Sequence, residues 1–496
     1  MTATVVLFSI LPLFGAFVIS LIGKKSKRFT DLFASVVTFV LAALAVHAAI
    51  LARANFPIVY SIGGWAPPIG ISAVLDGLSS FMLVTINVIA FLVTLYSIDY
   101  MEQFTDKWKF YTLFLLMVAG MNGVAITGDI FNLYVFLEIS AIASYALVAF
   151  GTEHEELEAS FKYMIMGAVA SSFILLGIAL LYGYASTLNM ADLAAVLAQK
   201  SGERIILLVS AFFVMGFGLK AAIVPFHAWL PDAHPSAPAP ISAMLSGVLI
   251  KTLGLYALIR IFFCVFGVTD AILSVFMVGG VLSMMVGVLL AIGQWDMKRL
   301  LAYHSISQVG YIILGIGLGT PLGILGGIFH LFNHSIFKSL LFLNSGAVEY
   351  STGTRDLREM GGLNKKMPVT GGTSLIASMS ISGIPPFNGF WSKLIIIIAC
   401  VQSGHYIFAM WAVIGSVLTL ASFTKVQKFA FFGDLKKALI GVREVPVFMR
   451  ISMISLSVIC LLGGALLIPF LKPFLTDAVD VILSGKEYAL IALRNM

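Results

Sequence analysis

Two lysines flank an interrupted apolar stretch in the middle of the chain. Lys220 lies inside one apolar run, which breaks at Pro225 and leads into a loop rich in proline and histidine. The apolar run that follows carries Lys251. A lysine at the centre of a membrane helix costs about 2.5–3.5 kcal/mol, and a bilayer interior tolerates non-helical backbone only where protein or a water-filled cavity surrounds it. The pattern therefore predicts a polar path inside a membrane protein.

A third lysine, Lys393, follows a second interrupted stretch, SISGIPPFNGFWSK, which breaks at Pro385 and Pro386. Interrupted segments at corresponding places in two halves indicate an inverted-repeat transporter with sites near the membrane midplane. A buried lysine can release its proton, which an arginine cannot do. We therefore expect Lys393, Lys220 and Lys251 to transfer protons. For Lys251 the alternative is a lysine that only faces the proline-rich loop.

Glu138 is a carboxylate inside the apolar run DIFNLYVFLEISAIASYALVAF. No lysine or arginine lies one turn away on the same helix, so its neutralising partner must come from another helix or from protonation. Desolvation favours the neutral carboxyl group and a nearby lysine favours the charged one, so such a pair can switch its charge. We expect a proton relay at Glu138. The alternative is a static ion pair that only orients helices, because desolvation can cancel the attraction.

Two histidines and a lysine share one face of the run GIFHLFNHSIFKSLLFLNSG. His330, His334 and Lys338 follow one another at intervals of one helical turn. We expect a hydrated row that carries protons between the lysine centres. Histidines satisfied within the core are the alternative. A metal site is a third option, but it lacks the carboxylate of a HExxH zinc motif, so we expect no metal.

Other titratable residues lie near the ends of these runs. His227 and His234 lie at the break after Lys220. One interpretation is that they admit protons from the cytoplasm. His304 is interpreted as a hydrogen-bonding residue of a loop, and Asp76 as a helix cap.

The composition excludes a soluble protein. Hydrophobic residues make up 60% of the 496 residues and charged residues 11%, whereas about a quarter of a soluble domain is charged. Three distant cysteines, Cys264, Cys400 and Cys460, form neither a disulfide framework nor an iron–sulfur ligand pattern. With no nucleotide motif either, we expect no cofactor and no redox centre on this chain.

Apolar runs long enough to span a bilayer, about 20 residues each, predict an all-α polytopic membrane protein. About fourteen such runs lie at residues 3–23, 30–52, 76–98, 110–128, 130–150, 160–183, 204–224, 240–262, 270–292, 300–319, 322–348, 369–402 (broken), 406–429 and 448–471. Residues 186–204 predict a short surface helix capped near Asn189. The amphipathic tail, residues 472–496, is expected along the membrane surface or against a partner.

Basic residues gather in the loops after odd-numbered runs. These are Lys24, Lys25, Lys27, Arg28, Lys107, Lys109, Lys298, Arg299, Arg355, Arg358, Lys365, Lys366, Lys436, Lys437 and Arg443. Loops after even-numbered runs hold little beyond Arg53, Lys200, Arg204 and Arg260. Short loops rich in lysine and arginine face the cytoplasm. We therefore expect a multi-pass protein of the cell membrane with both termini outside.

These motifs resemble the antiporter-like subunits shared by Mrp-type cation/proton antiporters, respiratory complex I and membrane-bound hydrogenases. The similar segments are DIFNLYVFLEISAIASYAL, GLKAAIVPFHAWLPDAHPSAPAPISAMLSG, KRLLAYHSISQVGY, HLFNHSIFKSLLFL and GIPPFNGFWSK, which are spread over nearly the whole chain. The length and the short tail look like the D-type member of Mrp systems. The complete PDAHPSAPAP box looks more like the redox-driven members.

The resemblance implies one membrane domain with two inverted five-helix repeats and discontinuous seventh and twelfth helices. On that pattern, residues 1–109 form three N-terminal helices, 110–262 the first repeat, 270–430 the second repeat, and 431–496 the last helix and tail. It also implies that Glu138 and Lys220 form the pair of the first half-channel. Lys251 then leads inward, and Lys393, which stands where one complex I subunit has glutamate, serves the second half-channel.

The resemblance implies a proton-pumping subunit of a redox-driven complex, with the D-type member of an Mrp-type Na⁺/H⁺ antiporter as the alternative. The implied partners are antiporter-like and small Mrp-type membrane subunits, with a peripheral redox module in the first case and sodium as a second ion in the other. A membrane subunit that only docks partners is a further alternative. Nothing in the sequence indicates nucleic acid as a partner.

Overall fold

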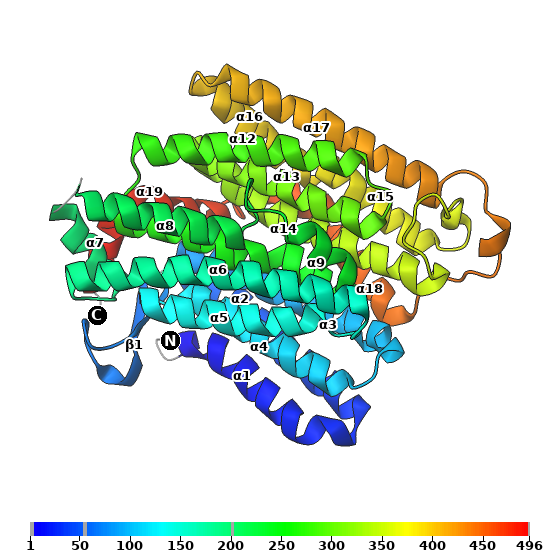
Figure 1. Cartoon of the computed structure of the whole chain (residues 1–496), viewed down its shortest axis with the longest axis horizontal. Helices are drawn as coiled ribbons and strands as arrows, with labels where there is room; N and C mark the ends of the chain where they lie inside the picture. Colours follow the sequence, from blue (N-terminus) through cyan, green and yellow to red (C-terminus); the bar gives the residue numbers. More distant parts are fainter. Residues whose placement is uncertain (1–3, 53–56, 200–202, 495–496) are drawn as a thin grey trace.

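A computed structural model describes residues 4–52, 57–199 and 203–494, and most of its helices run side by side in one bundle (Figure 1). In these residues, eleven helices are long and apolar enough to cross a membrane. The other three predicted spans fall on α8 (Arg204–Lys220), on α14 (Pro321–Thr352) and on the pair α15 (Pro368–Ser382) and α16 (Asn388–Gln402). The prediction of an all-α polytopic membrane fold is confirmed. Arg53 and Lys200 lie outside the described residues.

The membrane helices follow the predicted order. The first six are α1 (Thr4–Ile22), α2 (Lys27–Ala52), α3 (Gly77–Tyr100), α4 (Lys107–Ile126), α5 (Ile130–Val148) and α6 (His154–Ala185). Next come α8 (Arg204–Lys220) with α9 (Leu230–Ser236), then one continuous helix made of α10 (Ala239–Met244), η4 (Leu245–Leu249), η5 (Lys251–Tyr256), α11 (Ala257–Ile259) and η6 (Arg260–Phe266). The rest are α12 (Asp270–Ile292), α13 (Met297–Gly317), α14 (Pro321–Thr352), α15 (Pro368–Ser382), α16 (Asn388–Gln402), α17 (Tyr406–Val426) with η8 (Gln427–Phe431), and α18 (Val447–Leu462).

Smaller elements connect or cover these helices. Single 3₁₀ turns are η1 (Gly23–Lys25), η2 (Ile62–Gly64), η3 (Met101–Gln103), η7 (Leu363–Lys365), η9 (Lys437–Leu439) and η10 (Gly463–Leu467). An antiparallel hairpin of β1 (Ile58–Ser61) and β2 (Ser72–Leu75), which the sequence analysis does not predict, lies at the end of the bundle where α1 begins (Figure 1).

The two implied five-helix repeats correspond to the helices that start with α4 and with α12, and the fourth span of each is broken. The second helix of each repeat starts at an aspartate. Asp129 accepts a hydrogen bond from the Asn132 amide at 2.7 Å, and Asp296 accepts one from the Arg299 amide at 2.8 Å. Both aspartates also form an isolated antiparallel bridge, Asp129 with Asn189 and Asp296 with Asp356. With five spans in each, the two repeats are expected to run in opposite directions across the membrane. The residue boundaries expected for the parts of the chain stay a prediction.

Replacing Asp129 with alanine is expected to lower the free energy of unfolding by about 1 kcal/mol, because the Asn132 amide loses its cap. Asp129→Asn should keep most of that stability, since asparagine caps equally well. Asp270, which is exposed in the first turn of α12 while Thr269 caps that helix, provides the control substitution Asp270→Ala. Unfolding of the purified variants in detergent measures the difference, and equal losses for both alanine variants would contradict it.

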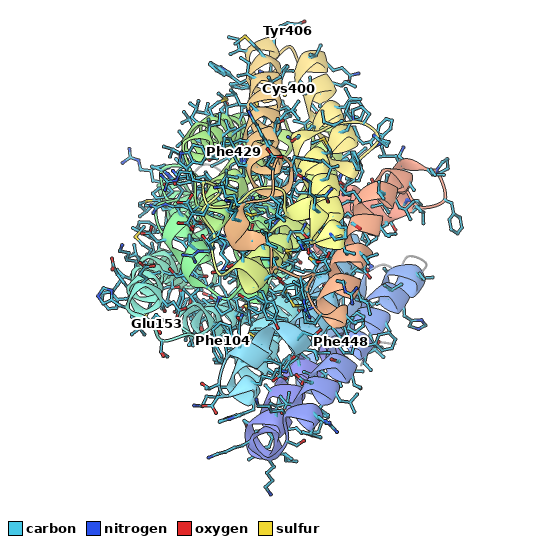
Figure 2. All side chains as sticks on the ribbon, turned by 90° about the vertical axis from the view of Figure 1, so that its right-hand side faces the viewer. Phe104, Glu153, Cys400, Tyr406, Phe429 and Phe448 are labelled. Carbon is cyan, nitrogen blue, oxygen red and sulfur yellow. The ribbon has the colours of Figure 1, made fainter. Side chains whose placement is uncertain are left out.

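Two helices form the centre of the bundle. Every residue of the candidate span Ala239–Phe266 is buried, as is nearly all of α14 from Gly323 to Val348. Seen from the end that carries the loops after odd-numbered spans, α1 and α2 lie at one edge of the bundle and α16 and α17, near the labels Cys400 and Tyr406, at the other (Figure 2). The central position of these two helices places Lys251, His330 and Lys338 far from lipid.

The surface segments agree with the sequence only in part. The predicted surface helix is α7 (Met190–Gln199), and Asn189 caps it by accepting hydrogen bonds from the amides of Ala191 and Asp192. The tail forms α19 (Pro473–Arg494), which packs on α3, η6, α7 and α14 and buries Leu475 and Ile482. The apolar face of the N-terminal half of α19 is therefore covered by the chain itself. Its place relative to the membrane surface or to a partner stays a prediction.

The loops after odd-numbered spans lie together at the right-hand end of Figure 1, while α1 begins and α19 lies toward the left-hand end. The basic residues of the sequence are thus concentrated at one end of the bundle. Which end faces the cytoplasm stays a prediction.

Candidate functional site

Glu138 of α5 and Lys220 of α8 face each other. Lys220 Nζ lies 3.5 Å from Glu138 Oε1 and 3.4 Å from the Tyr145 hydroxyl, and Ser171 of α6 donates a hydrogen bond to the same carboxylate oxygen. The side chain of Lys220 is 4% exposed and that of Glu138 is 25% exposed. The predicted partners are therefore brought together across helices, and the carboxylate is the more exposed of the two groups.

The break after Lys220 is held by contacts from neighbouring segments. The helix α8 ends at Lys220, Ala222 has a positive φ of 55°, and the Val224 amide donates to Ser283 Oγ of α12 at 3.0 Å. Trp229 Nε1 donates to the Leu219 carbonyl at 3.1 Å, which satisfies a carbonyl group near the helix end. The break is therefore a fixed feature that ends the helix beside the ammonium group.

Lys251 lies in the fully buried central helix, where π-helical turns replace the α-helical register. Its Nζ donates to the carbonyls of Ser246 and Gly247, the latter at 2.7 Å. The Ser246 hydroxyl is also 2.7 Å from that of Ser305 on α13. Single π turns inside helices are frequent at functional sites, and here the altered register directs two carbonyl oxygens toward the ammonium group.

Lys220 and Lys251 lie on packed segments but do not touch. A Cβ added to Gly254 would come within 2.5 Å of the Ala221 Cα, so the two backbones meet one residue from Lys220 and three from Lys251. Within the described part of the chain, no hydrogen bond or ion pair joins the two lysines. Transfer between them therefore requires an intervening group such as water.

The central row consists of His330, His334 and Lys338 on α14. The parallel imidazole rings of His330 and His334 are 6.3 Å apart. Both ring nitrogens of His334 and the Nζ of Lys338 are buried without a hydrogen-bonding partner among the described side chains. Buried polar groups of this kind are satisfied by internal water, so the row is suited to hold a hydrated path.

His330 connects this row to the second lysine centre. One ring nitrogen of His330 lies 2.9 Å from Ser392 Oγ and the other 3.2 Å from Gln308 Oε1. Both nitrogens are thus engaged, which leaves neither free for a metal ion. Ser392 directly precedes Lys393 on α16, so His330 reaches the helix that carries the second lysine centre. A proton link from the row to Lys393 stays a prediction.

Lys393 lies beside the second helix break. Its Nζ donates to the Ile381 carbonyl at 2.7 Å, lies 3.5 Å from Ser416 Oγ, and sits 4.6 Å from the centre of the Tyr311 ring. The helix α15 ends at Gly383, whose φ of 77° suits a residue without a side chain. No carboxylate of the described residues bonds to Lys393, in contrast to Lys220.

His234 lies at the other end of the row, and His227 does not join it. The His234 ring stacks on Phe342 at 4.6 Å, and Lys338 Nζ lies 5.5 Å from the centre of the same Phe342 ring. His234 is fully buried, and neither ring nitrogen has a hydrogen-bonding partner in the described chain. For His227, no ring contact or hydrogen bond of its side chain to the row occurs among the described residues.

A polar cavity of about 630 Å³ opens near His234. Its walls include Ser236, Glu349 and Arg355, and Glu153 on another wall lies at the end of the bundle that faces the viewer in Figure 2. Glu349 also forms an ion pair of 2.8 Å with Lys298. Because Ser236 is two residues from His234, the cavity brings solvent close to the end of the row.

His304 is a functional candidate that the sequence interpretation missed. It is fully buried within α13, not in a loop, and its Nε2 lies 2.8 Å from Ser422 Oγ. The error arises because the polar residues before it look like a loop, whereas Asp296 caps a helix that starts at Met297. The recurrence of His304, Gln308 and Tyr311 at helical spacing is the signal that identifies this polar face.

Asp76 is a helix cap, as expected, but also half of a buried ion pair. It accepts a hydrogen bond from the Ser79 amide at 2.7 Å, and its second oxygen lies 2.7 Å from a guanidinium nitrogen of Arg260. Arg260 also donates to the Tyr256 hydroxyl at 3.0 Å. The assignment of Arg260 to a loop is therefore wrong, since it lies inside the central helix.

Two stretches of the chain match known protein families. Residues 127–419 match the family described as "NADH:quinone oxidoreductase/Mrp antiporter, TM", and residues 65–111 match "NADH-Ubiquinone oxidoreductase (complex I), chain 5 N-terminus". The chain belongs to the NADH:quinone oxidoreductase/Mrp antiporter family. It is therefore an antiporter-like membrane subunit of the Mrp and complex I type, as the resemblance implies.

Individual relatives come from both branches of this family. The chain is 38% identical over 438 residues to the N-type subunit of NADH-quinone oxidoreductase from Desulforudis audaxviator, covering 87% of each sequence. It is 37% identical over 382 residues to the D-type subunit of the Na⁺/H⁺ antiporter from Alkalihalophilus pseudofirmus, covering 76% of this chain and 77% of the relative.

Two solved structures share the fold over nearly the full length. One chain of the Mrp complex from Dietzia sp. DQ12-45-1b superposes with a TM-score of 0.91 at 29% identity, covering 99% of each chain. One chain of the membrane-bound sulfane sulfur reductase, an archaeal respiratory membrane complex, superposes with a TM-score of 0.91 at 32% identity and the same coverage. All four relatives are thus components of membrane complexes.

Proposed function

We propose that this chain translocates protons within a multi-subunit complex by switching the charge of buried Glu and Lys side chains. The observation that carries the proposal is the contact of Glu138 with Lys220 beside a helix break, at 3.5 Å. In the proposed mechanism this pair opens and closes. A row of buried polar side chains then lies between Lys251 and Lys393, and internal water would have to bridge the gaps in it. Ser392, His330, His334 and Lys338 form this row.

The charge switch follows from elementary electrostatics. While the Glu138 carboxylate lies beside it, the Lys220 ammonium keeps its proton, because opposite charges stabilise each other in a medium of low dielectric constant. When the pair separates, the buried ammonium group loses this stabilisation and releases its proton toward Lys251 and the row. Lys393 then receives a proton and releases it on the far side of the membrane.

The direction of transport follows from the proposed orientation. The end with the basic loops faces the cytoplasm, and both termini lie outside. Protons then enter from the polar cavity beside His234 as well as through the pair of Glu138 and Lys220. Moving one charge against 100 mV costs about 2.3 kcal/mol. Since no redox centre is expected on this chain, partner subunits or an opposing ion gradient must provide that energy.

We propose a redox-driven parent complex, with partner membrane subunits and a peripheral redox module. The complete PDAHPSAPAP box and the similarity to a quinone oxidoreductase subunit and to a sulfane sulfur reductase chain support this assignment. The similarity to two Mrp-type chains supports the second candidate, sodium/proton exchange without redox chemistry. Iron–sulfur absorbance of the intact purified complex distinguishes them, because only the redox-driven assembly carries such clusters.

Replacing Glu138 with glutamine or Lys220 with methionine is expected to lower proton uptake by the reconstituted complex about 10²-fold. Either change removes one half of the switch while keeping the size of the side chain. Glu158→Gln on α6 is the matched control, since Glu158 forms an exposed ion pair with Lys162. Undiminished uptake in both pair variants would disprove the mechanism and favour a subunit that only docks partners.

A further inference from the structure

A second, mostly apolar crevice lies beside Lys393. It is lined largely by α16 and α17, which form one edge of the bundle (Figure 2). Its volume is about 250 Å³, and its walls are mainly aliphatic and aromatic. Val413 and Val417 of α17 line it and are 46% and 61% exposed, so the crevice opens sideways at the surface of the chain. A sideways opening on an apolar surface faces acyl chains, not water.

The base of this apolar crevice holds the amino group of Lys393. Lys393 is only 2% exposed, and its ammonium group has two oxygen acceptors, the Ile381 carbonyl and Ser416 Oγ, for three N–H donors. Among the residues that the structure describes, no carboxylate lines the crevice. Lys220, by contrast, has Glu138. A buried ammonium ion without an anionic partner is electrostatically unfavourable, so the neutral amine is favoured until a carboxylate pairs with it. The site is thus complementary to a carboxylic acid attached to an apolar chain.

We propose that the crevice binds a long-chain fatty acid, with its carboxylate on Lys393 and its alkyl chain between α16 and α17. The neutral acid enters from the acyl region of the bilayer. On contact with the neutral amine its O–H bond breaks and an N–H bond forms, which leaves a carboxylate beside an ammonium ion. The pair has no net charge, which makes it the least costly charged arrangement at this depth.

The depth of Lys393 selects a free fatty acid over a phospholipid headgroup. The fifteen residues of α15 cover about 22 Å of the membrane before the break. Nine residues of α16 follow Lys393, which correspond to about 14 Å on the other side. Lys393 therefore lies near the middle of the bilayer. A headgroup phosphate stays at the surface, whereas a protonated carboxylic acid can reach this depth.

The consequence for transport rests on the proposed function. A bound carboxylate would stabilise the protonated form of Lys393, as Glu138 does for Lys220. The protein opens the pair of Glu138 and Lys220 in the proposed cycle, but it has no means of separating the fatty acid from Lys393. Fatty acids are therefore inhibitors that act at the second half-channel, and their methyl esters, which cannot pair with the lysine, are not.

Photolabelling of the intact purified complex in nanodiscs of a zwitterionic phospholipid tests the site. The probe is a long-chain fatty acid with a diazirine in its alkyl chain, and its methyl ester is the comparison compound. Mass spectrometry should find the label on peptides of α16 and α17, about tenfold more from the acid than from the ester. Lys393→Met should reduce labelling by the acid to the level of the ester. Leu420→Trp, which fills the crevice, should abolish both.

The matched control is Lys428→Met, because Lys428 is an exposed lysine near the end of α17 that does not line the crevice. It should label as strongly as the unchanged complex. Equal labelling by acid and ester, or full labelling of the Lys393→Met variant, would overturn the proposal. So would the absence of label in the intact complex, because a partner subunit would then cover the crevice. Labelling does not depend on transport, so Glu138→Gln should retain it even where proton uptake is lost.

Discussion

Lys251→Met is expected to lower proton transport by the parent complex by about 10²-fold or more. Lys251 is fully buried, and its ammonium group is held by two carbonyl oxygens of its own helix. Methionine preserves the length and flexibility of the side chain but can neither bind nor release a proton. Initial rates of proton uptake into vesicles that hold the reconstituted complex measure the loss.

Lys251→Arg separates proton transfer from charge. Arginine keeps the positive charge and hydrogen-bond donors but stays protonated. If Lys251 only satisfies the carbonyls of the π-helical turn, arginine should restore transport. If Lys251 hands on a proton, the arginine variant should be nearly as slow as the methionine variant. Lys425→Met is the control, because Lys425 is half-buried and also donates to two carbonyls, those of Ile292 and Gln294, away from the row.

The positions of the charged side chains could be predicted from the sequence because a charge within an apolar run is conspicuous. Hydropathy locates Glu138, Lys220, Lys251 and Lys393 and the breaks beside two of them. It also finds the repeat, since an interrupted span is visible in each half. The fold and the candidate residues of the row thus follow from local patterns along one helix at a time.

The groups that connect these charges could not be predicted in the same way. Ser171 reaches Glu138 from another helix, and Ser392 reaches His330 across 62 residues of sequence. Serine in an apolar helix is common and gives no signal by itself. The partners of Lys251 are backbone carbonyls, and their direction depends on a π-helical register that composition does not reveal.

The ion pair of Asp76 and Arg260 is another contact between helices that could not be predicted from the sequence. The sequence correctly identifies Asp76 as a cap, because capping depends on neighbours three residues away. Its pairing with Arg260 joins positions 184 residues apart. A positive residue near the end of an apolar run looks like part of a loop unless the opposing helix is known.

Arg260→Met is expected to destabilise the protein by about 3–5 kcal/mol, because it leaves the carboxylate of Asp76 buried without its cationic partner. Asp76 is fully buried and lies 2.7 Å from the guanidinium group. The same substitution removes the hydrogen bond to the Tyr256 hydroxyl, which itself donates to the Ala125 carbonyl at 2.6 Å. Unfolding of the purified variants in detergent measures the loss in the free energy of unfolding.

The double variant Asp76→Asn/Arg260→Met tests the cause. Asparagine can still cap the helix at the Ser79 amide but carries no charge, so the double variant should be more stable than Arg260→Met alone. Arg358→Met provides the control, because Arg358 forms an exposed ion pair of 2.6 Å with Asp356, and such pairs contribute about 0–1 kcal/mol. If Arg260→Met and Arg358→Met lose equal stability, the buried pair does not have the role assigned to it.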